Sequence, residues 1–128
     1  MKFVEISPPR RFTVGNSVKF EMRDCERVTL GPDEQITLVT ESGAEYDVAR
    51  KEWGFYATPS LNGRLESFGL RAVLIRNTLT GRYFVLLVER GREDAFAAYM
   101  SQESLQVVSW LDNTANLDAL RARLGGEA

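Results

Sequence analysis

Two apolar runs decide the fold, Leu70-Arg-Ala-Val-Leu-Ile-Arg76 and Arg82-Tyr-Phe-Val-Leu-Leu-Val-Glu89. Each is nearly continuous, as expected of central strands that are buried on both faces. The segment between them, Asn77-Thr-Leu-Thr-Gly81, suits a hairpin loop with its glycine in the left-handed conformation. The sequence therefore predicts an antiparallel hairpin over residues 70–89.

A helix and a third strand follow this hairpin. Gly91 ends the second apolar run, and the spacing of the next residues predicts a helix over residues 92–101. Acidic residues stand in its first turn, and one face carries the apolar residues Phe96, Tyr99 and Met100. Residues 105–110 read as a strand. The second half is thus expected to be a ββαβ unit whose helix covers the sheet.

The chain is expected to end in another helix. Asn116 is a candidate cap, and Leu117, Leu120 and Leu124 recur at the spacing of one helical face. Gly125-Gly126 would stop this helix.

The first half has the pattern of short antiparallel strands separated by turn signals about every ten residues. Ser7-Pro8-Pro9 is expected to end the first strand, because proline cannot donate to a strand ladder, and Asp24-Cys25 to break a later one. The predicted strands are residues 2–6, 10–14, 18–23, 27–30, 35–40 and 45–50. We expect a meander, sandwich or partial barrel, joined to the second half in a single α+β domain of residues 1–128.

Composition indicates a soluble globular protein, with 44% hydrophobic and 27% charged residues. No apolar run approaches the roughly 18 to 20 residues that span a bilayer. The first residues, Met1 to Ile6, lack the apolar core of a secretory signal, and the single cysteine, Cys25, fits a reducing compartment. A cytoplasmic location without membrane association is therefore expected.

The absence of histidine restricts the chemistry. Ser-His-Asp and Cys-His catalysis are excluded, and with one cysteine a zinc site would need carboxylates almost alone. The sequence predicts no metal and no cofactor.

Charge is unevenly distributed along a chain whose net charge is -2. Residues 64–92 contain six arginines and only two acidic residues, whereas residues 93–128 are acidic overall. The acidic total gives no support to nucleic-acid binding.

The stretch Trp53-Gly-Phe-Tyr-Ala-Thr-Pro-Ser-Leu-Asn-Gly-Arg-Leu65 is the candidate site. It combines large rings with hydrogen-bonding groups and is expected to form an ordered loop, with Asn62-Gly63 in a tight turn of positive backbone angles. Rings that stack on an apolar face and polar groups that meet oxygens suit sugar or nucleotide recognition. The predicted ligand-binding residues are Trp53, Tyr56, Ser60, Asn62 and Arg64.

A structural interpretation of the same stretch stays open, because its aromatic residues could instead plug the end of a barrel. Arg64 is the favoured polar residue, since arginine binds phosphate or carboxylate in a bidentate manner. Arg71 and Arg76 would point to opposite faces of one strand, so they cannot both line one pocket.

The run from Trp53 to Arg64, with Phe68-Gly-Leu70 and the run from Arg82 to Glu89, resembles small uncharacterised bacterial proteins associated with surface-polysaccharide and sugar-nucleotide biosynthesis. The resemblance covers roughly residues 45–112. It implies an accessory or binding role near activated sugars and names no activity.

Together these features predict a non-catalytic protein that binds a small anionic ligand, such as a sugar phosphate or a nucleotide sugar. One alternative is a small metal-independent enzyme that acts on an activated sugar, with Asp47, Glu52 or Tyr56 as acid or base. Another is a structural interaction module that self-associates as a homodimer through apolar strand edges.

Overall fold

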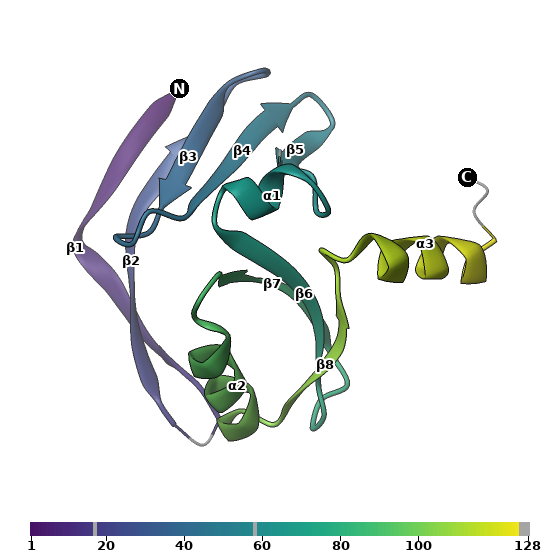
Figure 1. The fold of residues 1–128 in the computed structure, drawn as a ribbon. Coiled ribbons are helices and arrows are strands. Elements are labelled where there is room, and N and C mark those ends of the chain that lie inside the picture. The colour runs from purple at the N-terminus through teal and green to yellow at the C-terminus, as the bar shows by residue number, and fades with distance from the viewer. Residues whose placement is uncertain (17, 58, 126–128) are drawn as a thin grey trace.

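The structure is a computed structural model that describes residues 1–16, 18–57 and 59–125. It is an α+β fold of mostly antiparallel strands, as predicted (Figure 1). The strands are β1 (Lys2–Val14), β2 (Phe20–Thr29), β3 (Gln35–Val39), β4 (Glu45–Lys51), β5 (Gly54–Ala57), β6 (Leu70–Asn77), β7 (Tyr83–Glu89) and β8 (Leu105–Trp110). The helices are α1 (Arg64–Ser67), α2 (Glu93–Gln102) and α3 (Thr114–Arg123).

The predicted ββαβ unit is confirmed. β6 pairs antiparallel with both β7 and β8, so the sheet has the order β7-β6-β8. Gly81 has a φ of 74°, the left-handed conformation expected for the hairpin loop. The prediction that both apolar runs are central strands is wrong for β7, which lies at an edge and leaves its residues Tyr83 to Val85 exposed.

Two apolar clusters cover the two faces of this sheet. On one face, α2 contributes Met100 to a cluster with Val73, Ile75 and Val88, as expected for a covering helix. On the other face, Leu65 of α1 packs with residues of β6 and with Ala44, which directly precedes β4. The second cluster joins the N-terminal half to the β6 sheet and fixes the position of the candidate stretch.

Strands β3, β4 and β5 form the expected antiparallel meander. The expectation of a loop throughout residues 53–65 is wrong, because β5 and the start of α1 fall within it. β5 is a short edge strand that pairs only with β4. Gly54 adopts a φ of 147°, which lets the chain turn from β4 into it.

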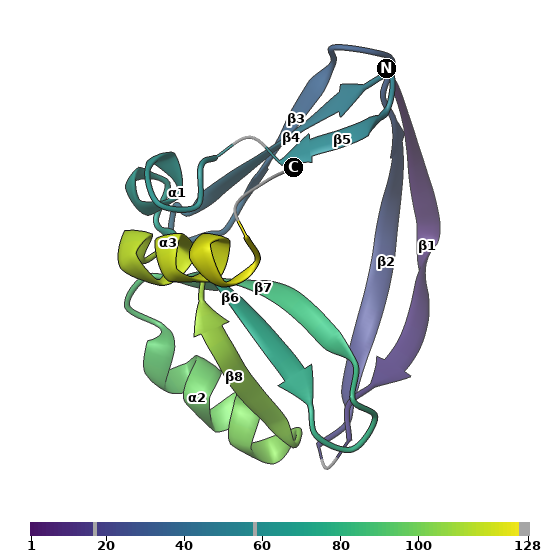
Figure 2. The ribbon, with the colours of Figure 1, turned by 90° about the vertical axis from the view of Figure 1, so that its right-hand side faces the viewer.

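The first two strands form a long two-stranded ribbon, β1–β2, separate from the other sheets. The predicted breaks at Ser7-Pro8-Pro9 and Asp24-Cys25 are wrong. β1 passes through both prolines at an irregularity between Glu5 and Arg10, where they do not have to donate to the ladder. Figure 2 shows the ribbon running along one side of the molecule, from the β3–β5 sheet to the loop end of β6–β7.

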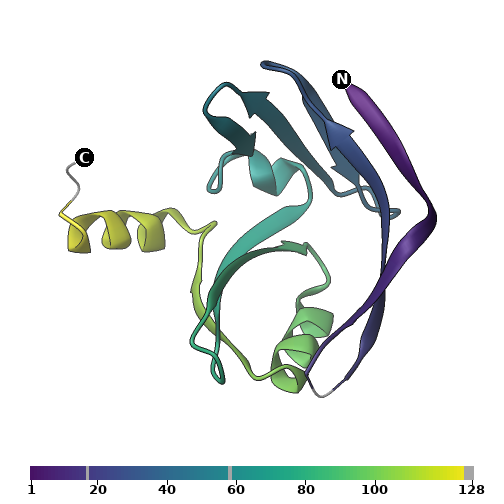
Figure 3. The same cartoon turned by 180° about the vertical axis from the view of Figure 1, so that it is seen from behind.

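α3 projects from the rest of the chain (Figures 1 and 3). Its cap is Asn113, whose side-chain oxygen accepts a hydrogen bond from the backbone of Asn116 at 3.0 Å. The prediction that Asn116 is the cap is therefore wrong, because the cap lies three residues earlier in the chain. Gly125 ends the helix with a φ of 88°, as expected, while Gly126 lies outside the described residues.

Within residues 1–16, 18–57 and 59–125, no helix has the length and apolar character needed to cross a membrane. The same residues bring together no group of three or more cysteine or carboxylate side chains placed to hold a metal ion.

Candidate functional site

A cavity of about 290 Å³ lies between the meander and the exposed face of β7. Strand β5, the segment that follows it, α1 and β7 all contribute to its wall. The lining residues are Tyr46, Tyr56, Ala57, Pro59, Ser60, Leu61, Leu65, Val85 and Leu87. Most of the wall is apolar, and its hydroxyl groups come from two tyrosines and one serine.

Tyr56 and Tyr46 both line this cavity, from adjacent strands. Tyr56 lies on β5 opposite Ala49 of β4 and is 52% exposed. Its neighbour Phe55 points to the other face of the strand and does not line the cavity. Burial raises the pKa of Tyr46, whose hydroxyl, like that of any tyrosine, is protonated at neutral pH and can donate a hydrogen bond.

Ser60 is held in place by the first turn of α1. Its hydroxyl oxygen accepts a hydrogen bond from the backbone of Arg64 at 2.8 Å, and its carbonyl accepts one from Leu65 at 3.0 Å. The turn between them differs from the prediction, since Gly63 has a φ of -143° and no left-handed conformation. The turn is held by Ser60, which accepts hydrogen bonds from the first two backbone amides of α1, and not by positive angles at Asn62-Gly63.

The other three predicted residues lie outside the cavity wall. The Arg64 guanidinium lies over the Phe68 ring, 5.2 Å from its centroid. The Asn62 amide donates to the Thr114 hydroxyl at 3.2 Å and so tethers the segment to α3. Trp53, in the turn between β4 and β5, is 71% exposed. The structure thus brings together two of the five predicted site residues.

Arg71 has a structural role in an ion-pair network. Its Nε lies 2.7 Å from Asp112, its Nη1 lies 3.5 Å from Glu93, and its guanidinium stacks on Trp110 at 3.9 Å. The hydrogen bond from Arg71 holds the pKa of Asp112 below its usual range. This arginine ties β6 to α2 and to the end of β8, so it is not free to meet a ligand.

The carboxylates considered for an enzyme also lie outside the cavity wall. Asp47, on β4, accepts a hydrogen bond from the Thr37 hydroxyl at 2.8 Å. Glu52 is exposed in the turn beside Trp53. Of the three candidate acid or base residues, only Tyr56 lines the cavity.

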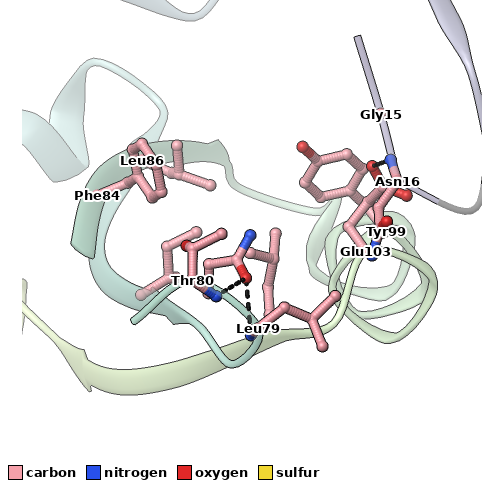
Figure 4. Close-up of a pocket in the computed structure, with 11 residues that line it drawn as sticks. Gly15, Asn16, Leu79, Thr80, Phe84, Leu86, Tyr99 and Glu103 are labelled. Carbon is pink, nitrogen blue, oxygen red and sulfur yellow. Dashed lines mark hydrogen bonds between the residues drawn. The ribbon is translucent and has the colours of Figure 1, made fainter. Parts of the chain in front are cut away.

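A second cavity, of about 410 Å³, was not foreseen from the sequence (Figure 4). It lies where the ribbon tip meets α2 and the β6–β7 loop. The buried Glu103 carboxylate accepts a hydrogen bond from the backbone of Asn16 at 2.6 Å, and the side chain of Asn77 orders the loop by accepting from Leu79 and Thr80. Most other lining residues are apolar, including Ile75, Phe84 and Leu86. No local pattern could have revealed this contact, because Asn16 and Glu103 are 87 residues apart.

Comparison of the chain with family models, with curated proteins and with solved structures finds no match.

Proposed function

We propose that this protein is a non-catalytic binding or accessory protein for a small sugar-like ligand with an anionic group, such as a sugar phosphate or a nucleotide sugar. A role in bacterial polysaccharide metabolism, in the cytoplasm, belongs to the same proposal and rests on the sequence resemblance. The observation that carries the proposal is the 290 Å³ cavity whose wall includes Tyr46, Tyr56 and Ser60.

The cavity wall offers both kinds of contact that a sugar ring needs. Tyrosine rings and the apolar side chains of Pro59, Leu61 and Leu65 can pack on the apolar face of a sugar or a base. The hydroxyls of the two tyrosines and of Ser60 can hydrogen-bond to sugar oxygens. The wall therefore offers contacts for the sugar or base, whereas the anionic group needs a partner beside the cavity.

Arg64 is the proposed partner of the anionic group. Its neighbour Leu65 lines the cavity, and within the described part of the chain Arg64 enters no ion pair. The contact with Phe68 is one that a flexible arginine can exchange for a phosphate at little cost. A phosphate that projects from the cavity toward α1 would meet this guanidinium.

The first test is a thermal-shift series with free hexoses, hexose phosphates and nucleotide-linked hexoses. A ligand at about 100 times its Kd should stabilise the fold by about 2.7 kcal/mol, a rise of several degrees in Tm. Tyr56→Ala should abolish the shift, whereas Phe55→Ala, on the opposite face of β5, should retain it.

Arg64 is tested in the same series. Arg64→Ala should weaken binding of the phosphorylated ligands and leave any binding of the free sugar unchanged, with Arg82→Ala as a matched exposed control. The proposal is wrong if no ligand of these classes shifts Tm, or if Tyr56→Ala and Phe55→Ala respond alike.

A second candidate function is self-association as an interaction module. The large accessible surface area of the chain favours it. The accessible surface is 9268 Å², whereas a compact monomer of 14.4 kDa exposes about 6,800 Å². The surplus is about 2,400 Å², more than the roughly 800 Å² that each partner contributes to a standard interface. Much of this surface is apolar, which supports a macromolecular partner as well as a small ligand.

A further inference from the structure

α3 is a helix without a core of its own. None of its residues is buried, and Leu124, which follows its last turn, is 75% exposed. Leu117, Leu120 and Leu124 nevertheless share one face, on which Leu117 is half-buried and the other two are exposed, and Arg121 flanks that face because it lies four residues after Leu117. An apolar stripe beside a positive charge is the pattern of a helix that packs against another surface.

The direction of the helix is set by the three residues before it, each of which is held in place. The backbone of Leu111 donates to Ala72 of β6 at 2.9 Å, the Asp112 carboxylate is paired with Arg71, and Asn113 caps the helix. The tether between Asn62 and Thr114 holds the first turn as well. Figures 1 and 3 show α3 directed away from α2.

A groove between α2 and β8 has complementary properties. Its volume is about 450 Å³, and its acidic end is formed by Glu93 and Asp94. Its apolar wall is formed by Phe96, Ala97, Met100, Leu105, Val107 and Trp110. Glu93 already pairs with Arg71, whereas Asp94 enters no ion pair among the residues that the structure describes.

We propose that this groove receives α3 of a second copy of this chain, and that the two copies exchange their α3 helices across a two-fold axis. The leucine stripe would fill the apolar wall, and Arg121 would lie against Asp94. α2 and α3 both have ten residues and hence lengths of about 15 Å, so stripe and groove match in extent. An antiparallel approach of the two helices brings the basic end of α3 to the acidic start of α2.

A second copy fits better than an unrelated protein, because one chain carries both the unpartnered stripe and the groove that suits it. A reciprocal exchange satisfies both surfaces on both copies and closes into a dimer with no free site left over. Two helix–groove contacts would also bury part of the surplus surface.

The test is the oligomeric state of the full chain by sedimentation equilibrium. The unaltered protein should be a dimer at micromolar concentration. Leu120→Asp should raise the dissociation constant by at least about 30-fold, the size expected at the centre of an interface. Asp94→Arg and Arg121→Asp should each raise it by about tenfold, and the double charge swap should restore affinity to near the starting value.

Asp118→Arg is the matched control, because Asp118 is exposed and lies neither three nor four residues from any of the three leucines, so its replacement should leave the dimer unchanged. Retained circular dichroism at 222 nm would establish that each variant folds. The proposal is overturned if the protein is a monomer at all concentrations. A monomer whose α3 amides are protected from exchange, because α3 folds back onto its own chain, would overturn it too. It is also overturned by a dimer that Leu120→Asp leaves intact or that the charge swap does not restore. Neither of these surfaces lines the Tyr56 cavity, so the outcome is independent of the ligand tests.

Discussion

The β7-β6-β8 sheet and the β1–β2 ribbon contain similar apolar residues and bury them to very different extents. Val73 of β6 is 0% exposed, whereas Val14 of β1 is 42% exposed. Both are strand residues, so local propensity does not account for the difference. The β7-β6-β8 sheet has α2 on one face and α1 on the other, while among the residues that the structure describes no helix or sheet packs along the ribbon in this way. Burial here is decided by what packs on a strand, not by the strand itself.

The ribbon touches the remaining elements mainly at its two ends. At the tip, Asn16 bonds to Glu103, and the rings of Phe20 and Tyr99 lie 6.3 Å apart. At the base, the terminal amine of Met1 lies 3.1 Å from Glu34. A two-stranded ribbon alone is marginally stable in water. The two regions should therefore open with different free energies.

A matched pair of valine substitutions tests this comparison with the largest expected change in the free energy of unfolding. Val73→Ala removes buried methyl groups and leaves a cavity, which should lower the free energy of unfolding by about 2–3 kcal/mol. Val14→Ala, at an exposed strand position, should change it by about 0.5 kcal/mol or less. Urea unfolding followed by circular dichroism measures both. Equal losses would mean that the ribbon is packed as tightly as the sheet.

Substitution of Arg71 tests how the β7-β6-β8 sheet is held to α2 and to the segment after β8. Arg71→Met should destabilise the protein by about 2 kcal/mol at neutral pH, because the Asp112 side chain is only 12% exposed and would lose its cation. Exposed pairs on the ribbon, such as Arg10 with Asp24, should contribute about 0.5 kcal/mol or less. Arg10→Met is therefore the control for Arg71→Met.

The same ion pair predicts a pH dependence with a definite sign. The pKa of Asp112 is lowered in the folded protein, mainly by the hydrogen bond from Arg71. Its contribution to stability is therefore present at neutral pH and is lost as pH falls below about 4, through the folded-state pKa. Urea midpoints measured from pH 6 to pH 2.5 should fall less steeply in Arg71→Met than in the unaltered protein. Parallel curves would contradict the assigned pairing.

The sequence predicted those parts of the fold that have a strong local signal. The hairpin of residues 70–89 was foreseen because its apolar runs are continuous and its loop ends in Gly81. The passage of β1 through Pro8 and Pro9 was missed, because a proline is compatible with a strand only where the partner leaves its nitrogen unpaired. Strand order in space has no local signal, so the edge position of β7 was missed as well.

The candidate site was predictable only in part for the same reason. The composition of residues 53–65 pointed to Tyr56 and Ser60, which do share a cavity. Tyr46 and Val85 reach that cavity from β4 and β7, and nothing in their own sequence surroundings marks them. Arg64 and Asn62 were placed in the site by proximity in the chain, but their side chains contact Phe68 and Thr114.

The smallest effect concerns α3, which resembles the ribbon in burying none of its residues. In the monomer, below the concentration at which copies associate, Asn113→Ala removes the cap and should destabilise the helix by about 1 kcal/mol, equivalent to about fivefold faster exchange of the α3 amides, with little change in the urea midpoint. Asn116→Ala is the matched control, since that residue lies inside the helix, where alanine is the better helix former and exchange should slow. The two asparagines thus predict opposite signs from the same chemical change. If both variants lowered the urea midpoint by a similar amount, α3 would be part of the cooperative core and would belong with the β7-β6-β8 sheet.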